Sequence, residues 1–332
     1  MKALTILEPG RVEVREIPRP DPGPGEVLVK VAACGICGTD VHIFRGEYLG
    51  EYPIVPGHEF SGEVVEVGEG VSRIRVGQRV AVEPNISCDN CVSCLNNRQN
   101  FCLNWEAIGV TLQGAMAEYV VAPEKVVFDI GDLAFEEGAF VEPLSCVVHG
   151  IERAQIRLGD RIVILGAGPI GLLLLQVAKR RGAVDITVLE RQPARGQLAQ
   201  VYGADRWIED LEALERDAYD VVIDASGALP VMARTLSLVR NGGTILLFGV
   251  PPRGGELPMD AFAIFEKGVT IRSSYTSRRN SLQAVAMLQS GAVAVEDLVS
   301  HCLPLHRFED GVRFIEKGLE DVKKVLMIPN AA

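Results

Sequence analysis

The sequence lacks the features that mark secreted proteins, membrane proteins and proteins that bind nucleic acids. It opens with MKALTILEPG, so it has no basic segment followed by an apolar run, as a secretory signal requires. Its longest uncharged stretch, 162–178, is interrupted by glycines and a proline, which indicates a buried core rather than a membrane span. A net charge of −11 opposes contact with the phosphates of nucleic acids. We therefore expect a cytoplasmic protein without a membrane or nucleic-acid partner.

Aromatic residues (6%) and histidines (five) are also scarce, whereas 48% of the 332 residues are hydrophobic. A chain of this length suggests roughly two domains. Residues 1–80 are rich in proline and glycine, which separate short β-branched or alternating runs at 12–17, 27–32 and 62–67. This pattern is typical of short strands and tight turns, and it predicts a compact β-barrel.

From about residue 150 onward, predicted strands alternate with predicted helices. The strands are expected at 161–165, 185–190, 219–225, 244–250 and 269–275. The helices are expected at 169–181, 194–202 and 229–240, and a further helix at 282–289 and a closing strand at 324–328 follow. Such alternation implies a parallel sheet covered on both faces, so the fold class is α/β.

Four of the eight cysteines are gathered in one short segment with the spacing C-x2-C-x2-C-x7-C: Cys88, Cys91, Cys94 and Cys102. Thiolates this close repel one another unless a cation holds them, and a tetrahedral Zn²⁺ with Zn–S bonds of about 2.3 Å is the usual solution. Two disulfides are the alternative, but clustered cysteines in a reducing cytoplasm are more often metal ligands. A zinc-ribbon nucleic-acid binder would also explain the quartet, but the acidic charge opposes it.

A dinucleotide-binding turn opens the second half of the chain. An apolar strand, 162–165, runs directly into Gly166-Ala167-Gly168-Pro169-Ile170-Gly171 and a helix. The glycines let the backbone approach a pyrophosphate, and the helix N-terminus supplies N–H groups. At the end of the next strand, Glu190 would accept hydrogen bonds from the adenosine ribose and repel the 2′-phosphate of NADP, which favours NAD. Arg191 and Arg195 keep NADP open, because a guanidinium can pair with that phosphate.

A second set of chemically active side chains mixes thiol, hydroxyl, imidazole and carboxylate groups: Cys37, Thr39, His42, His58, Glu59 and Glu142. Catalytic zinc uses three protein ligands of such mixed kinds and keeps one position open. Zinc held by Cys37, His58 and one glutamate would be formally neutral and still Lewis acidic, so it would lower the pKa of a bound alcohol. Glu59 and Glu142 both remain candidates for the third ligand. We expect one to bind the metal and the other to hydrogen-bond the metal's water.

These motifs resemble those of the zinc-dependent medium-chain dehydrogenase/reductase family. The resemblance covers essentially the whole chain and rests on Gly35–His42, Gly57–Glu59, the cysteine quartet, Glu142–Leu144 and Gly166–Gly171, in that order. It implies a GroES-like zinc catalytic domain at 1–150 with a structural zinc lobe at 85–105, a Rossmann NAD-binding domain at 151–275, and a return to the catalytic domain at 276–332. It also implies two zinc ions per chain and an active site in the cleft between the domains.

The resemblance further implies roles for individual residues. The alcohol proton would leave through Thr39, the nicotinamide ribose and His42, and Arg195 would contact the adenosine ribose. Other cofactor contacts are expected where later Rossmann strands end, at Ser226, Gly249, Val250 and Tyr275. Relatives of this kind are often tetramers, and the strand 269–275 would extend the sheet across a dimer, so we expect a homo-oligomer.

The substrate class follows from smaller differences. Glu142 resembles the polyol dehydrogenase branch, so the expected reaction is reversible hydride transfer from a polyol, cyclitol or vicinal diol to NAD, which forms a ketone. Ile43 and Ser274 stand where sorbitol-type enzymes carry other residues, which disfavours sorbitol itself. L-Threonine is the main alternative, because threonine dehydrogenases share the pattern at 37–42, although they usually carry aspartate in place of Glu142. A zinc-free quinone reductase relative would leave Cys37, His58 and the quartet unexplained.

Three cysteines fall outside both sets of potential ligands: Cys34, Cys146 and Cys302. Free cysteine is commonly found inside proteins, so we expect all three to be buried.

Overall fold

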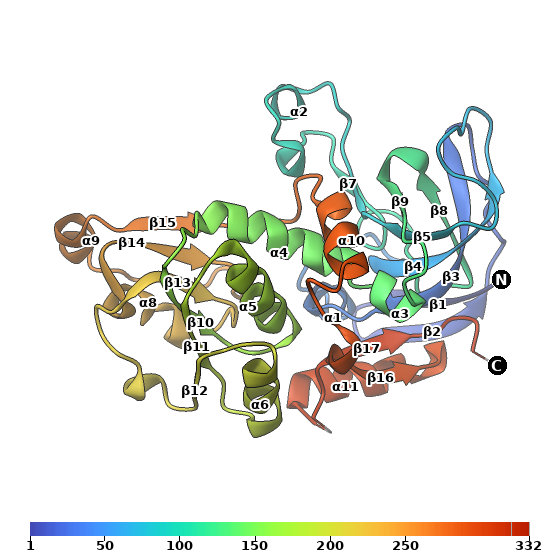
Figure 1. The fold of residues 1–332 in the computed structure, drawn as a ribbon. Helices are drawn as coiled ribbons and strands as arrows, with labels where there is room; N and C mark the ends of the chain where they lie inside the picture. The colour runs from blue at the N-terminus through green and yellow to red at the C-terminus, as the bar shows by residue number, and fades with distance from the viewer. Residues whose placement is uncertain (320, 332) are drawn as a thin grey trace. The chain divides into compact units, whose positions relative to one another are not determined.

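The computed structural model describes residues 1–319 and 321–331. The chain forms two compact units, unit 1 from Met1–Ser145 and Ser277–Ala332 and unit 2 from Cys146–Thr276 (Figure 1). Unit 2 is therefore inserted into the sequence of unit 1. Within the described residues, every helix is too short or too polar to cross a lipid bilayer.

Unit 1 is built on a seven-stranded sheet in the order β16-β17-β3-β4-β5-β9, with β8 paired to β3. Its strands are β3 (Glu26–Gly35), β4 (Glu59–Val67), β5 (Arg79–Val82), β8 (Tyr119–Pro123), β9 (Val127–Asp129), β16 (Val299–Leu303) and β17 (Lys324–Met327). Because alternate residues of a strand share a face, β3 places Val27, Val29 and Val31 in one core. The C-terminal strand β17 pairs with β3 at Cys34 and Gly35, directly before Cys37.

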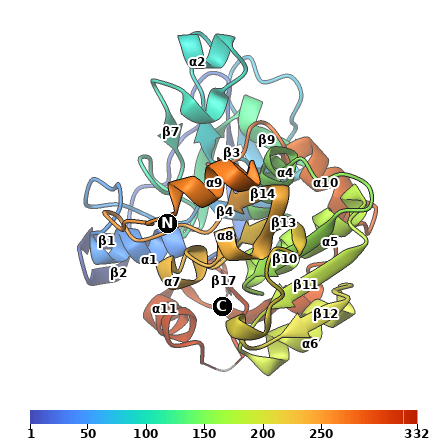
Figure 2. The ribbon, with the colours of Figure 1, turned by 90° about the vertical axis from the view of Figure 1, so that its left-hand side faces the viewer.

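Smaller elements complete unit 1. Two small antiparallel sheets are formed by β1 (Lys2–Glu8) with β2 (Arg11–Glu16) and by β6 (Asn85–Ile86) with β7 (Glu106–Ala107). The helices are α1 (Gly38–Arg45), α2 (Val92–Leu95), α3 (Phe135–Gly138), α10 (Ser281–Gln289) and α11 (Phe308–Lys317), and α4 (Val141–Ala154) continues into unit 2. Figure 2 shows α2 and β7 in the projecting lobe that carries the cysteine quartet.

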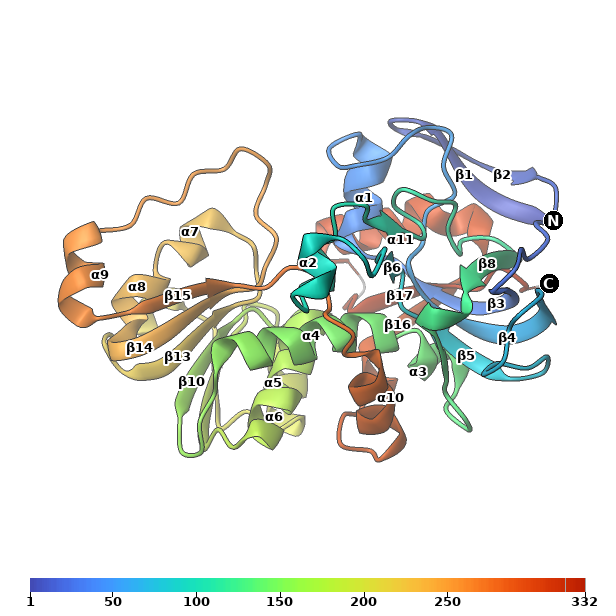
Figure 3. The ribbon, with the colours of Figure 1, turned by 90° about the horizontal axis from the view of Figure 1, so that it is seen from above.

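Unit 2 is a six-stranded parallel sheet in the order β12-β11-β10-β13-β14-β15. The strands are β10 (Arg161–Leu165), β11 (Asp185–Leu189), β12 (Arg206–Ile208), β13 (Tyr219–Asp224), β14 (Val239–Leu247) and β15 (Thr270–Ser273). The helices are α5 (Pro169–Arg181), α6 (Pro193–Val201), α7 (Leu229–Met232), α8 (Thr235–Leu238) and α9 (Ala261–Lys267). Figure 3 shows α5 and α6 on one face of the sheet and α7 and α8 on the other. The predicted parallel sheet with helices on both faces is confirmed, and its central strands are buried, apolar runs as such a position requires.

One predicted helix is wrong. The stretch 229–240 forms two short helices, α7 and α8, and its last two residues belong to β14. Hydroxyl groups compete for the carbonyls at the break, because Thr235 Oγ1 donates to Met232 O at 2.6 Å and Ser237 Oγ donates to Arg234 O at 2.8 Å. Val239, fully buried, pairs with Tyr219 instead of continuing the helix. Tertiary pairing therefore overrides the local helical pattern.

Two further differences from the predictions concern a short strand and two cysteines. The strand β12 pairs with β11 but was not predicted, because its three residues are too few to show a period. Cys34 is buried as expected, but Cys146 is only half-buried and Cys302 is exposed. Cys302 lies on β16, the edge strand of its sheet, which has a neighbouring strand on one side only.

Candidate metal centres and nucleotide site

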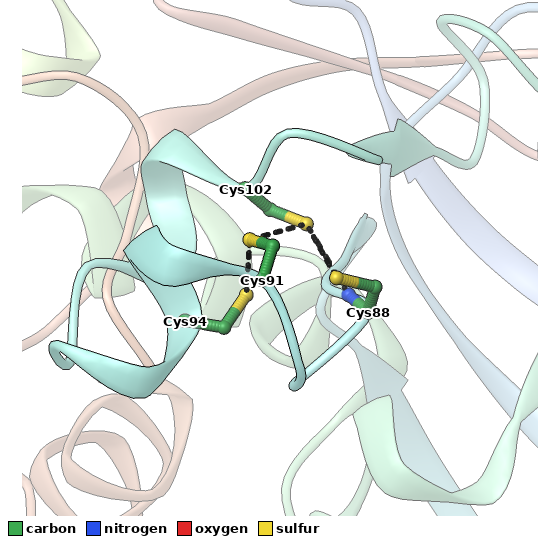
Figure 4. A group of neighbouring side chains, drawn as sticks. All are labelled: Cys88, Cys91, Cys94 and Cys102. Atoms are coloured by element: carbon green, nitrogen blue, oxygen red, sulfur yellow. Dashed lines mark hydrogen bonds between the residues drawn. The ribbon is translucent and has the colours of Figure 1, made fainter.

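The cysteine quartet forms a compact cluster of four sulfur atoms (Figure 4). The Sγ–Sγ distances are 3.5 Å for Cys91–Cys94, 3.9 Å for Cys91–Cys102 and 3.4 Å for Cys88–Cys102. Ligands at about 2.3 Å from a tetrahedral zinc ion lie about 3.8 Å apart, close to these values. All four cysteines are free thiols, so the disulfide alternative is not adopted. The cluster fits one fully enclosed zinc ion.

Backbone N–H groups prepare this cluster for negative charge. The N–H of Cys88 points at Cys102 Sγ at 3.3 Å, and that of Leu103 points at Cys91 Sγ at 3.4 Å. Hydrogen bonds from the backbone, that of Asn90 foremost, lower the pKa of Cys88 to about 6, and the Leu103 N–H lowers the pKa of Cys91. Burial, and then the proton shared with Cys91, raise the pKa of Cys94 to about 12. A cation is what allows all four sulfurs to ionise together.

A second group of ligand atoms, from Cys37, His58 and Glu59, also lies within 4.8 Å of one another. Cys37 stands at the N-terminus of α1, and His58 and Glu59 stand where β4 begins. Gly57 makes the approach possible. It has φ +97°, and a Cβ atom there would lie 2.7 Å from Cys34 Sγ and 2.9 Å from a backbone nitrogen. Only glycine fits such a position.

Asp40, which sequence reasoning passed over, organises this group. Its fully buried carboxylate accepts the N–H of Cys37 at 2.8 Å and the N–H of Gly57 at 3.0 Å. It also lies 3.5 Å from His58 Nδ1. Burial opposes protonation of His58, but Asp40 and Cys37 outweigh it and raise the pKa of His58 well above its ordinary value. Asp40 and Cys37 therefore favour a positive charge beside His58.

Lys324 is the second residue that sequence reasoning missed. It stands on β17, and its ammonium forms a buried ion pair with the Glu59 carboxylate and donates to Ile36 O at 3.1 Å. Gly35 leaves room for this pair, because a Cβ atom there would lie 2.3 Å from Glu59 Oε2 and 2.6 Å from Lys324 Cε. No local pattern marks Lys324, since its partner is 265 residues away in the sequence.

The other predicted catalytic residues lie at different distances from this centre. Thr39 Oγ1 is 3.8 Å from Cys37 Sγ, and His42, half-exposed on α1, places Nδ1 2.7 Å from Glu47 Oε2. Glu142 is buried at the start of α4. Among residues 1–319 and 321–331, the ligand atoms gathered within 4.8 Å come from Cys37, His58 and Glu59, and Glu142 is not part of that group.

The glycine-rich turn has the local structure that its sequence predicts. Gly166 has φ +106°, and a Cβ atom on Gly171 would lie 1.9 Å from Gly166 O, so both positions require glycine. Pro169 occupies the first turn of α5, behind Gly168 as the N-cap, and Ile170 follows it in that turn. Glu190 follows β11 and lies at the turn, where its carboxylate accepts the N–H groups of Ala167 and Gln192, each at 2.9 Å.

The remaining predicted cofactor contacts are spread over unit 2. Ser226 lies beside the glycine turn, because a Cβ atom on Gly166 would be 3.5 Å from Ser226 Cβ. Gly249 adjoins the same loop, whereas Val250 and Tyr275 are exposed. Arg191 is exposed and Arg195 is half-buried on α6. The carboxyl ends of β10, β11, β13 and β14 thus share one edge of the sheet, which is where such folds bind dinucleotides.

Comparison with known proteins identifies the family of the chain. Residues 23–132 match the alcohol dehydrogenase GroES-like domain, and residues 169–290 match the zinc-binding dehydrogenase domain. D-altritol 5-dehydrogenase of Agrobacterium fabrum is 37% identical over 92% of this chain and 93% of its own length. L-threonine 3-dehydrogenase of Xanthomonas axonopodis pv. citri is 32% identical over 96% of this chain and 97% of its own length.

Among solved structures, one described as a zinc-binding dehydrogenase of Sinorhizobium meliloti 1021 bound to NADP superposes with a TM-score of 0.95 at 35% identity, over 99% of each chain. Family models, relatives and fold therefore lead to the same assignment. The chain belongs to the zinc-dependent medium-chain dehydrogenase/reductase family, in its polyol and threonine dehydrogenase-like branch.

Proposed function

We propose that this chain is an NAD-dependent zinc dehydrogenase that oxidises one secondary alcohol group of a polyol, cyclitol or vicinal diol to a ketone. The observation that carries the proposal is the contrast between two ligand groups. Four thiols can enclose one zinc ion completely, whereas Cys37, His58 and Glu59 offer three ligands and leave one tetrahedral position for substrate. When bound there, zinc supplies Lewis acidity that lowers the pKa of the alcohol, and the dinucleotide accepts the hydride.

The residues around the open site have separate tasks in this proposal. Cys37, His58 and Glu59 would hold the metal, and Asp40 fixes Cys37 through its N–H and lies 3.5 Å from Nδ1 of the His58 ring. Lys324 restrains the Glu59 carboxylate through their buried ion pair. We assign Glu142 to hydrogen-bond the water or alcohol in the open position, because its carboxylate is buried at the start of α4 and stands outside the ligand group.

Oxidation releases a proton as well as a hydride, and α1 offers a route for it. Thr39 and His42 are three residues apart on one helix and therefore share a face. The Thr39 hydroxyl would accept the alcohol proton as it gives up its own, and His42 would pass the released proton to water, since its ring is half-exposed. Glu47 holds the Nδ1 side of that ring at 2.7 Å. The products are the ketone, NADH and one proton.

Glu190 supports NAD as the cofactor. Its carboxylate is fixed at the glycine turn by the N–H groups of Ala167 and Gln192, where its charge would repel a 2′-phosphate. The similar structure of Sinorhizobium meliloti is bound to NADP, so NADP is the competing cofactor. Arg191 and Arg195 are the cations that would meet its phosphate.

A sugar alcohol is the substrate class that we favour. D-altritol 5-dehydrogenase, at 37% identity, acts on such a molecule by its name, and L-threonine 3-dehydrogenase is less similar at 32%. Glu142, where threonine enzymes usually carry aspartate, favours the same choice. Threonine remains the second candidate because the segment 37–42 suits it as well.

We further propose a homo-oligomer, a dimer or tetramer, in a reducing cytoplasm. The strand β15 is the edge of the sheet of unit 2, and such an edge offers unpaired backbone groups to a second copy. Phe262 and Phe265 on the preceding helix are 68% and 81% exposed, which supports burial against a partner. Eight free cysteines, four of them placed for metal, support that compartment. Light scattering after size-exclusion chromatography tests the oligomer.

One panel tests the reaction. Polyols, cyclitols, vicinal diols and L-threonine are each incubated with NAD⁺ or NADP⁺, and the reduced nicotinamide is followed by absorbance. We expect a polyol or cyclitol with NAD⁺ to give the highest kcat/KM. A higher value for L-threonine, or no turnover of any alcohol by protein with two zinc ions, would overturn the proposal.

Two matched variants test the division between the metal centres. Cys37→Ser should abolish turnover and reduce the zinc content from two ions to one, while the melting temperature changes little. Cys102→Ser should also lose one zinc ion, but mainly at the expense of stability or assembly. Equal loss of chemistry in two well-folded variants would contradict the separate roles. A wild-type protein that oxidises alcohol while it contains only one zinc ion would contradict the assignment of a second, catalytic zinc ion.

A further inference from the structure

A buried carboxylate outside both metal groups stands at the centre of the nucleotide edge of unit 2. Asp224 is the last residue of β13 and is fully buried. The groups that donate hydrogen bonds to its carboxylate are neutral and lie in the loop that follows β13. Oδ1 accepts the N–H of Ser226 at 3.2 Å and its hydroxyl at 2.6 Å, and Oδ2 accepts the N–H of Gly227 at 3.1 Å.

The same residue also holds the loop that follows β14. The main-chain carbonyl of Asp224 accepts the N–H groups of Phe248 at 3.0 Å and Gly249 at 2.9 Å. The two segments are packed without spare room, because a Cβ atom on Gly249 would lie 2.1 Å from Gly227 N and 2.7 Å from Asp224 Oδ2. A Cβ atom on Gly227 would lie 2.4 Å from Val250 O. One aspartate therefore fixes 226–227 against 249–250.

The sheet order says which part of a dinucleotide these segments face. The glycine turn follows β10, and Glu190, the proposed adenosine contact, follows β11 on one side of it. Asp224 follows β13 on the other side of β10, and Ala225 N donates to Leu165 O at 3.0 Å. A dinucleotide whose pyrophosphate rests on the glycine turn extends its adenosine to the β11 side, so its nicotinamide half lies on the β13 and β14 side.

We infer that Asp224 is a positioning residue that orders the backbone of 226–227 and 249–250 into the surface that receives the nicotinamide half of the cofactor. The inference rests on the proposed function, since it presupposes a dinucleotide. Burial raises the pKa of Asp224, as expected for a carboxylate kept from water, and the hydrogen bonds from Ser226, Gly227 and Gly249 act against that shift. A carboxylate is suited to the task because it only accepts hydrogen bonds, and every group facing it is a donor.

Asp224→Asn is the direct test, because it keeps the shape and exchanges one acceptor oxygen for an NH₂ donor. In either orientation of the amide, one backbone N–H of the loops faces another donor. Binding is measured on the zinc-loaded, full-length protein by NADH fluorescence and, separately, by titration with AMP. We expect the Kd for NADH to rise about tenfold or more, because a buried donor is left unsatisfied. The Kd for AMP should stay within about twofold, since Glu190 and the glycine turn are untouched.

The control is Asp220→Asn on the same strand. Asp220 also accepts a backbone N–H, that of Arg161 at 2.9 Å, but at the opposite end of β13. It should leave both affinities unchanged. Asp224→Glu keeps the charge and the acceptor oxygens but displaces them by one methylene, so it should lose less NADH affinity than Asp224→Asn, again with AMP unaffected.

The outcomes separate the inference from the proposed function. If wild-type protein binds neither NADH nor AMP, the proposed function fails. If wild-type protein binds both, three results overturn only the inference. The first is an unchanged NADH affinity in Asp224→Asn, and the second is an equal loss of NADH and AMP affinity in that variant. The third is an Asp224→Asn protein that does not fold, together with an Asp224→Glu protein that binds NADH like wild type. The last two would mean that the carboxylate supports the whole unit rather than the two loops.

Discussion

The buried pair between Lys324 and Glu59 leads to a quantitative prediction about stability. The two side chains are only 8% and 2% exposed, so water does little to screen either charge. Lys324→Met keeps the aliphatic volume and strands the Glu59 carboxylate next to the Cys37 sulfur and Asp40. Removing one partner of a buried pair costs about 3–5 kcal/mol, so we expect a loss of that size in the free energy of unfolding of unit 1.

The chain supplies a convenient assay, because it has two tryptophans, one in each unit. In a Trp207→Phe background, Trp105 alone reports the urea unfolding of unit 1. The measurement is made after chelation and again with zinc, and the loss should be smaller with zinc because the bound cation also compensates Glu59. Lys323→Met, which removes a neighbouring half-buried lysine, serves as the control and should change the free energy of unfolding by about 0.5 kcal/mol or less.

The double variant Glu59→Gln/Lys324→Met removes both charges, and it should recover most of the lost stability in the chelated protein. A loss below about 1 kcal/mol for Lys324→Met, or a double variant no more stable than the single one, would refute the reasoning.

Other predictions concern the glycine turn and a surface ion network. Gly168→Ala meets no atom within 4 Å and has an ordinary φ of −64°, so its free energy of unfolding should stay within about 0.5 kcal/mol while NADH affinity falls. Gly171→Ala should instead destabilise unit 2 by about 1–3 kcal/mol in urea unfolding, because its Cβ would lie 1.9 Å from a carbonyl oxygen. Hydrogen bonds from Arg161 and Arg206 lower the pKa of Glu215 from 4.5 to about 2. The contribution of the Glu215 carboxylate to the stability of the fold is therefore complete above pH 4.5 and disappears as the pH falls towards 2. Melting temperatures of Glu215→Gln and wild type should converge over that range, and a constant difference would contradict the assignment.

The sequence reveals those parts of the sites whose residues are close together in the chain. The quartet spans one short segment, and the glycine turn joins one strand to one helix. Their spacing alone therefore predicts zinc binding and dinucleotide binding. Spacing alone does not identify Cys37 and the His58–Glu59 pair as ligands, and their prediction depends on the mixture of thiol, imidazole and carboxylate groups. The structure then added the proximity of their atoms.

Residues that act through distant contacts could not be found in this way. Lys324 is the first residue of the predicted strand 324–328, and Asp40 lies three residues after Cys37, where its side chain caps α1. Their second roles exist only after β17 has paired with β3 and Gly57 has come beside α1. The wrong helix at 229–240 has the same cause, because the pairing of Val239 with Tyr219 is invisible to a local pattern. Long-range pairing therefore accounts for both kinds of error.

The insertion of unit 2 into unit 1 has a consequence for synthesis on the ribosome. Unit 2 is one continuous segment, Cys146–Thr276, so all of its strands have left the exit tunnel while the last part of unit 1 is still being translated. Unit 1 needs β17, which follows unit 2 in the sequence, to complete its sheet beside Cys37 and to deliver Lys324 to Glu59. Unit 2 can thus fold before β17 has been translated, whereas the open metal site is completed only after β17 has emerged from the ribosome. A message truncated shortly before residue 324 would yield an intact nucleotide-binding unit attached to an incomplete catalytic one.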